Sequence, residues 1–253
     1  MSVTLSALSG VPIVSEGDKL CLIALTAVQH SGLSIENGDI LVVAQKIVSK
    51  AEGRLVRLAE VEPSDRAREL ACACDKDPRL VELILTESAE VLRVRKGVLI
   101  VRHRLGLVLA NAGIDQSNVD HGDGEAALLL PLDPDASARR LQESIVQAVG
   151  AQVGVVVIDS LGRAWRNGVV GTAIGVAGIP AVIDLRGVAD LYGRVLRSTE
   201  IGFADEIAAA ASAVMGQAGE RTPIVHVRGF VATRDEGARA SDLVRSRETD
   251  LFP

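Results

Sequence analysis

Aromatic side chains are scarce in this sequence of 253 residues, where Phe, Trp and Tyr together make up 2%. The core must therefore be built from Val, Leu, Ile and Ala, and the aromatic platforms on which single-stranded nucleic acids stack are missing. Basic residues do not predominate either, because 27 Lys and Arg face 33 Asp and Glu, for a formal net charge of -6. Nonspecific binding to a phosphate backbone is not expected from such a balance, so we expect no nucleic-acid partner.

Cysteine is equally rare. Cys21 lies in an apolar run, whereas Cys72 and Cys74 are too close for an ordinary disulfide and lack the second pair that zinc needs. We expect three reduced thiols in a cytoplasmic protein. The sequence has no secretory signal and no apolar run long enough to cross a bilayer, so we expect no membrane partner.

Several familiar active-site motifs are also missing. The sequence has no GxxxxGK[ST] phosphate-binding loop, no GxGxxG between a strand and a helix, no HExxH and no paired CxxC. Its 4 histidines lie in unrelated settings, so no Ser-His-Asp arrangement can be argued. What remains is Asp, Ser, Asn and Gln at loop positions, interleaved with Lys and Arg, which suits Mg²⁺ or Mn²⁺ together with phosphates.

Hydrophobic periodicity predicts alternating helices and strands. Ser64, Asp77, Asp133 and Asp135 are expected to cap helices, and the segment 45–53 is expected to be a loop after a strand. The predicted strands are a first strand and turn over 1–14, then 40–44, 91–101 as a hairpin, 155–158, 181–184 and 224–231. The predicted helices cover 18–30, 64–74, a segment from 78, 133–149, 203–215 and a charged tail from 240.

The stretch 155–175, VVVIDSLGRAWRNGVVGTAIG, looks most like a chemical site. A run of β-branched residues predicts a buried strand, and Asp159 and Ser160 follow it at once. A strand can fix a carboxylate on a hard cation, while Arg163 and Arg166 face phosphate or carboxylate. The other interpretation is a strand that ends in an Asp-initiated turn near Gly162, with two solvated arginines.

Three further groups of residues leave two interpretations open. Asp115 and Asn118 follow the small residues of 112–113 and could offer oxygen ligands and amide donors, or could form an Asx-rich surface turn. Lys46 and Lys50 could meet an anion, or could be a solvated strand end. Asp184 precedes Arg186, and Asp190 precedes Arg194. The two arginines could form salt bridges with these Asp residues, or could contact an anionic substrate.

The chain resembles the coenzyme F420-0:L-glutamate ligase (F420:γ-glutamyl ligase) family from about Val11 to Arg245. One departure is Ser160, where the family usually has Thr, and this change keeps the hydroxyl. The matching stretches are VPIVSEGD, GDILVVAQKIVSKAEGR, KDPRLVELIL, ANAGIDQSN, LLPLDPDASA, DSLGRAWRNG, AIGVAGI, DLRGVADLYGR, ADEIAAAA and MGQAGE.

The resemblance implies an α+β fold with mixed, largely antiparallel sheets and helices in an unusual, family-specific arrangement, assembled as an intertwined homodimer. It implies one ligase domain over 1–253, without the nitroreductase-like domain fused to some relatives. It also implies a GTP- and divalent-metal-dependent ligase that adds L-glutamate to F420-0 through γ-glutamyl amide bonds by way of an acyl phosphate. The expected cofactors are Mg²⁺ or Mn²⁺ at two sites, with K⁺ as a candidate further cation.

By resemblance, Asp115, Asp159, Ser160 and Gln217 match the metal ligands. We add Arg163, Arg166, Arg186 and Arg194 as candidates for the phosphodiester and carboxylates of F420-0. The candidate catalytic residues are Asp115, Asp159 and Arg163. The positions that match GTP binding are Val11, Pro12, Ile13, Val14, Gln45, Lys46, Lys50, Asn118, Met215, Gly216, Gln217, Ala218, Gly219, Glu220, Arg221 and Thr222.

Two other functions are compatible with the same residues. One is a nucleotide- or flavin-binding module that uses the pocket without turnover. The other is an amide ligase of the same chemistry with a different acceptor or amino acid, because specificity depends on pocket shape.

Overall fold

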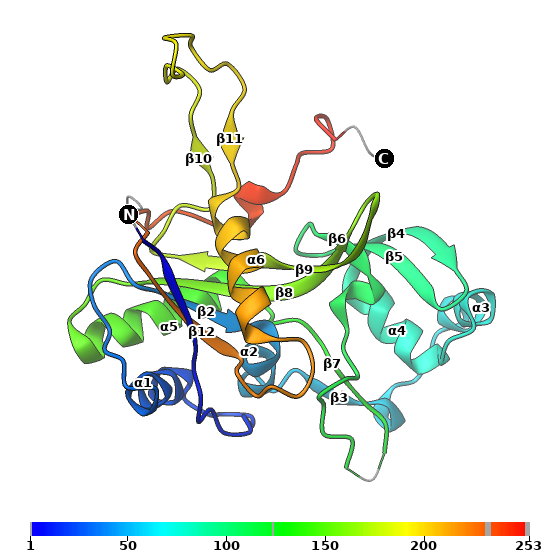
Figure 1. The fold of residues 1–253 in the computed structure, drawn as a ribbon. Coiled ribbons are helices and arrows are strands. Elements are labelled where there is room, and N and C mark those ends of the chain that lie inside the picture. Colours follow the sequence, from blue (N-terminus) through cyan, green and yellow to red (C-terminus); the bar gives the residue numbers. More distant parts are fainter. Residues whose placement is uncertain (1, 123, 231–233, 251–253) are drawn as a thin grey trace.

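A five-stranded sheet forms the centre of the protein in a computed structural model that describes residues 2–122, 124–230 and 234–250 (Figure 1). Only β2 and β8 are parallel, and the other neighbours are antiparallel. The expected mixed α+β class with largely antiparallel sheets is therefore confirmed. The strand order is β1 (Thr4–Ala7), β12 (Ile224–Arg228), β2 (Ile40–Ala44), β8 (Gly154–Arg163) and β9 (Arg166–Ala177).

Helices cover both faces of this sheet because the buried strands are apolar on both sides. Alternate residues such as Leu41 and Val155 pack toward α1 (Leu20–His30) and α5 (Pro134–Val149). The residues between them, such as Val42 and Val156, pack toward α6 (Phe203–Met215) on the opposite face. Continuous Val and Ile runs in β2 and β8 thus place two parallel strands in the middle of the core.

A second packed unit holds the middle of the chain, shown in cyan and green in Figure 1. Its core joins two helices to one face of a three-stranded antiparallel sheet. Ser64 and Asp77 cap these helices as predicted, by accepting hydrogen bonds from the N–H groups of Ala67 (3.2 Å) and Arg79 (2.8 Å). The elements are α3 (Asp65–Cys74), α4 (Pro78–Thr86), β4 (Ser88–Arg95), β5 (Val98–His103) and β6 (Val108–Ala110), with a short ladder of β3 (Leu55–Arg57) and β7 (Ala126–Leu128) beside them.

Glu87, just after α4, joins several parts of this unit. Its Oε2 lies 2.9 Å from Arg54 Nη2, 3.2 Å from Arg104 Nε and 3.5 Å from His103 Nε2. The Leu105 N–H donates to His103 Nδ1 (3.0 Å), so a neutral ring carries its proton on Nε2, toward Glu87. Burial alone would raise the pKa of Glu87, but His103 and the two arginines outweigh it and lower this pKa to about 2.

The outer edge of β9 is covered by two carboxylates from helix N-termini. Asp135, in the first turn of α5, accepts from the N–H of Val176 (2.8 Å), and Asp205, in the first turn of α6, accepts from the N–H of Ala173 (2.8 Å). Burial raises the pKa of both carboxyl groups. Asp133 is the N-cap of α5, so the expected second cap, Asp135, instead serves the sheet.

A long arm extends from the body between β9 and α6, built on the short strands β10 (Ile183–Asp184) and β11 (Glu200–Ile201) (Figure 1). Its tip exposes 91% of Leu191 and 90% of Tyr192. Large apolar side chains so far from the body gain nothing from the core of their own chain, which indicates a surface made for contact.

Three predicted segments were wrong. Residues 45–51 form helix α2 (Gln45–Ala51) and not a loop, because Ile47 and Val48 bury against the sheet. β8 continues through Asp159 and Gly162, and the chain turns later, at 164–165. The tail forms no longer helix in its described part, to residue 250, where the short 3₁₀-helix η3 (Ala240–Leu243) replaces the predicted charged helix. The predicted strand from Ile224 matches β12, and its last residue, Val231, lies outside the described residues.

Candidate active site

A cavity of about 880 Å³ opens at the carboxyl ends of β2 and β8. The register explains the location, because Ala44 pairs with Ile158 in the parallel ladder. The next residues, Gln45 at the start of α2 and Asp159 within β8, therefore lie side by side at the same edge of the sheet. Helix α2 begins where β2 ends, whereas β8 continues as a strand, and the cavity opens between the two. All residues that the family resemblance assigned to metal or nucleotide line this cavity, and their roles stay predictions.

Two carboxylates meet in the cavity, from β8 and from the loop after β6. Burial, and then the nearby charge of Asp115, raise the pKa of Asp159 to about 6. Burial also raises the pKa of Asp115, against the opposing effect of Lys46. Two half-buried acids that repel one another are well placed to share a cation.

Small residues put Asp115 into this position. The 3₁₀-helix η2 (Asn111–Gly113) has positive φ angles of 50°, 54° and 66° in succession. The Asn111 Oδ1 accepts from the Leu99 N–H (3.1 Å), and a Cβ on Gly113 would lie 3.0 Å from Leu130. Asp115 then pairs its backbone with Leu128, with hydrogen bonds of 3.0 and 2.8 Å. The left-handed turn is thus held on both sides, which fixes the carboxylate.

Helix α2 supplies an amide and two cations. The Ser49 Oγ donates to Gln45 Oε1 (2.9 Å), so the amide nitrogen faces the cavity and donates to Asp115 Oδ2 (3.2 Å). Lys46 Nζ lies 3.3 Å from the same carboxylate oxygen. Lys50, one turn later, donates to the carbonyl of Asn118 (2.8 Å). Burial, and then repulsion from Lys46, lower the pKa of Lys50, so an anion here would be favoured.

A loop after α6 closes the opposite wall. The Gln217 Nε2 donates to Ser212 Oγ (2.8 Å), which turns its amide oxygen toward β8, where it accepts from Ser160 Oγ (2.6 Å). The Asn118 Nδ2 donates to the carbonyl of Ala218 (3.2 Å) and so joins this loop to the Asp115 loop. Two more hydrogen bonds hold the loop: the Glu220 carboxylate accepts from the Ala218 N–H (2.7 Å), and the Thr222 hydroxyl donates to the carbonyl of Met215 (2.8 Å).

The four arginines lie outside the cavity lining. Arg163 and Arg166 are exposed at the tip of the β8–β9 hairpin. Arg186 pairs with Asp184 (2.6 Å) and Glu200 (3.3 Å) at the base of the arm, so the salt-bridge interpretation holds for it. The backbone N–H of Arg194 donates to Asp190 Oδ1 (2.8 Å) at the exposed end of the arm. Within the chain, none of the four lines the cavity that holds the two carboxylates.

Sequence reasoning missed some lining residues. Ser117 accepts from Lys46 Nζ (3.1 Å), and Val119, Asp120 and Val169 also line the cavity. Ser117 lies between the predicted Asp115 and Asn118, so the loop itself was the available signal. Val169 had none, because a valine in a strand indicates only packing.

The cavity suits a hard cation and not a soft one. Among the described residues, no group of three or more His, Cys, Asp or Glu side chains could hold a metal ion. The donors are two carboxylates, the Ser160 hydroxyl and the Gln217 amide oxygen, all of them oxygen atoms. Mg²⁺ and Mn²⁺ prefer such ligands and retain waters or phosphate oxygens in the remaining positions, so the residues fit the predicted ions.

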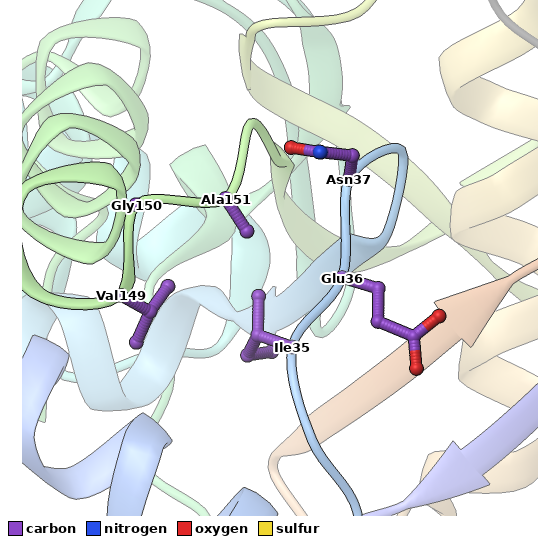
Figure 2. A pocket seen from close by; sticks show the side chains of 6 residues that line it. All are labelled: Ile35, Glu36, Asn37, Val149, Gly150 and Ala151. Carbon is purple, nitrogen blue, oxygen red and sulfur yellow. The ribbon is translucent and has the colours of Figure 1, made fainter.

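A second hollow, of about 510 Å³, lies between the end of α5 and the loop before β2 (Figure 2). Ile35, Val149 and Ala151 point into it, and Glu36 turns away, where it pairs with Arg228 (2.8 Å). The remaining polar side chain of the lining, Asn37, accepts from the Gln152 N–H (2.7 Å), so the larger cavity is the stronger candidate for a functional site. Separately, no helix in the described part of the chain is both long and apolar enough to span a bilayer.

Known proteins similar to this chain match most or all of its length. The family model described as F420-0:Gamma-glutamyl ligase matches residues 10–229. A protein of Methanothermobacter thermautotrophicus named coenzyme F420:L-glutamate ligase is 44% identical over 254 residues, covering 100% of this chain and 99% of its own. Proteins of the same name from Methanopyrus kandleri and Archaeoglobus fulgidus are 46% and 43% identical, covering 94% and 100% of this chain and 93% and 97% of their own.

Proposed function

The chain belongs to the F420-0:gamma-glutamyl ligase family, and we propose that it adds L-glutamate to coenzyme F420-0 in F420 biosynthesis, using GTP. One observation carries this proposal at the level of the site. A single cavity is lined by two mutually repelling carboxylates, by two lysines and by the loop 215–222, although these groups lie far apart in the sequence. Such a cavity combines cation binding with phosphate binding, which is what the activation of a carboxylate requires.

The chemistry follows from the low reactivity of a carboxylate toward an amine. A carboxylate oxygen of F420-0 attacks the γ-phosphorus of GTP, and the bond to the β-phosphate oxygen breaks to leave GDP and an acyl phosphate. The uncharged amine of glutamate then attacks the acyl carbon, loses a proton and expels inorganic phosphate. A γ-glutamyl amide results when the acceptor carboxylate is the γ-carboxylate of a glutamate added earlier.

The residues of the cavity divide this work. Two divalent cations would supply positive charge to the phosphates when bound, one held by Asp115 and Asp159 and the other by Ser160 and Gln217. Lys46 and Lys50 provide fixed charge for the triphosphate from one side of α2. We place the nucleotide against the segments 11–14 and 215–222, which both line the cavity and would exclude water from the reacting phosphate.

We further propose one ligase domain over 1–253 in a fold particular to this family, and an intertwined homodimer. The support for the dimer is the arm, whose tip exposes Leu191 and Tyr192 far from their own core. Arg186 and Arg194 lie on this arm and could reach an acceptor only as part of a partner's site. A cytoplasmic location is proposed because GTP is available there and the exposed, unpaired Cys72 thiol would stay reduced.

Mass spectrometry of F420-0 incubated with the protein, GTP, Mn²⁺ and L-glutamate tests the function directly. We expect successive mass increases of one glutamyl unit with stoichiometric release of GDP. Binding of GTP without turnover would favour the non-catalytic module. GTP turnover with another carboxylate and no change in F420-0 would favour an amide ligase with a different acceptor. Parallel reactions with Mg²⁺, and with and without K⁺, identify the cations.

A further inference from the structure

The turn between β8 and β9 carries an unusual side chain. Trp165 is the single tryptophan of the chain, is 87% exposed and has φ of +64°. Arg163 pairs with Arg166 across the hairpin, so Trp165 is the second residue of a two-residue turn, where positive φ favours Gly or Asn. One exposed hydrophobic residue is ordinary, but a bulky one in a strained conformation indicates a function that folding does not require.

Two arginines flank this tryptophan. Arg163 donates only a long hydrogen bond, of 3.4 Å, to the carbonyl of Asn167. Among the described residues, neither Arg163 nor Arg166 has an ion-pair partner, whereas Arg186 on the arm has two. The tip therefore offers an aromatic face between two uncompensated guanidinium groups, which together suit a flat ring attached to an anionic chain.

The hairpin joins this tip to the active-site cavity. Asp159 and Ser160 line the cavity from β8, and Val169 of β9, which pairs with Gly162, lines it farther along the same hairpin. Trp165 is five residues beyond Ser160, or about 17 Å along a strand that rises ~3.3 Å per residue. The cavity wall thus continues toward the tip.

F420-0 has a shape that matches this layout. A flat, flavin-like ring is joined through a sugar-alcohol chain and a phosphodiester to the carboxylate that must react. A linker of about ten bonds, each about 1.5 Å long, spans roughly 12 Å when extended, and half of the ring adds a few ångströms. An acceptor whose carboxylate lies beside Asp159 and Ser160 would therefore place its ring near the tip.

We propose that the β8–β9 tip is the binding site for the ring of F420-0, with Trp165 stacked on the ring and Arg163 and Arg166 facing the phosphodiester. This inference rests on the proposed function and adds an acceptor subsite to it. Trp165 acts by positioning the acceptor and makes no contact with the reacting atoms. The strain in the turn is maintained because only an aromatic side chain at this position covers the ring.

Steady-state kinetics of four variants test the subsite. We expect Trp165→Ala to raise the KM for F420-0 about ten-fold or more, a loss typical of one stacked ring, while the KM values for GTP and glutamate change little. Trp165→Phe should restore most of the affinity. Trp165→Asn suits the positive φ, so it should melt no lower than wild type and still lose F420-0 affinity. Leu22→Ala, at another exposed apolar residue, is the matched control and should change nothing.

Fluorescence gives an independent readout, because the chain has one tryptophan. F420-0 should quench the emission of the wild-type protein in a saturable manner, and GTP alone should not. An unchanged KM for F420-0 in Trp165→Ala overturns the inference, as does an equal rise for all three substrates. A change of oligomeric mass by light scattering, with kinetics unchanged, would make the tip a contact between copies and also overturn it. If wild type neither binds nor consumes F420-0, the proposed function fails as well.

Discussion

Lys46 Nζ lies 3.3 Å from Oδ2 of Asp115, an ion pair that joins the start of α2 to the loop after η2. The same carboxylate oxygen accepts from Gln45 and repels Asp159. Asp115 thus takes part in several of the interactions that link α2, the loop after η2 and β8 around the cavity.

Asp159→Asn keeps the size of the side chain and removes one of the two repelling charges. We expect turnover to be lost because the cation loses a ligand, with the free energy of unfolding near pH 7 unchanged or slightly increased, since burial disfavours the charged form. Glutamyl transfer and the melting temperature should be measured side by side. Full activity in a normally folded variant would show that Asp159 is not a metal ligand.

Lys50→Ala should weaken GTP binding and leave the glutamate requirement nearly unchanged. Loss of one charge-assisted contact costs about 1–3 kcal/mol, so the KM for GTP should rise roughly five- to 150-fold. Lys96→Ala is a suitable control, because Lys96 is exposed on a distant turn where it pairs with Asp75. An effect confined to the KM for glutamate would move Lys50 to the amino-acid site.

Gly113→Ala tests the turn that places Asp115. Positive φ alone costs about 1 kcal/mol of stability for a residue with a Cβ, and the added Cβ would also press on Leu130 at 3.0 Å. Gly97 also has a positive φ, +82°, but a Cβ there would meet nothing within 4 Å, so Gly97→Ala measures the cost of the positive φ alone. We expect both variants to lose stability in denaturant titrations, and only Gly113→Ala to lose kcat as well. Equal kcat in the two variants would contradict the positioning role.

Glu87 makes the stability of the protein depend on acid. Its pKa is about 2 in the folded protein and 4.5 when unperturbed, so the stabilisation is complete above pH 4.5 and disappears as the pH falls through 2. The shift corresponds to roughly 3 kcal/mol. Glu87→Gln should therefore lose stability near pH 7 and show a flatter profile between pH 4.5 and 2. Glu69→Gln, at an exposed position of α3, is the control. An equal fall in the free energy of unfolding between pH 4.5 and 2 in both variants would contradict the role of Glu87.

Local patterns predicted most of the helices and the buried strands. Ser64, Asp77 and Asp133 acted as caps because a cap needs only its own side chain and the next turn. The continuous apolar run at 155–158 was long enough to indicate a buried strand. By contrast, α2 was missed because polar residues surround Ile47 and Val48, and only packing against the sheet shows that these two face inward.

Local patterns could not show which loops meet. Asp115 and Asp159 were suspected separately, and each had an ordinary interpretation as a turn. Their meeting depends on the β2–β8 register and on the Asp115–Leu128 bridge, which form between segments far apart in the sequence. The family resemblance supplied the grouping that spacing could not. The arginines are a different case: the fold places none of the four in the cavity lining, so their role toward the substrate stays a prediction.

The carboxylates of Asp135 and Asp205 on the β9 edge have a consequence for how copies of this chain can assemble. Each uses an N–H group that an incoming strand would need, at Val176 and Ala173. The central sheet is therefore closed to extension by a neighbouring molecule at these positions, and ribbon-like growth from this edge is blocked. At acidic pH the two groups would take up protons and hold the edge less firmly, so the protein would be most prone to aggregate in acid.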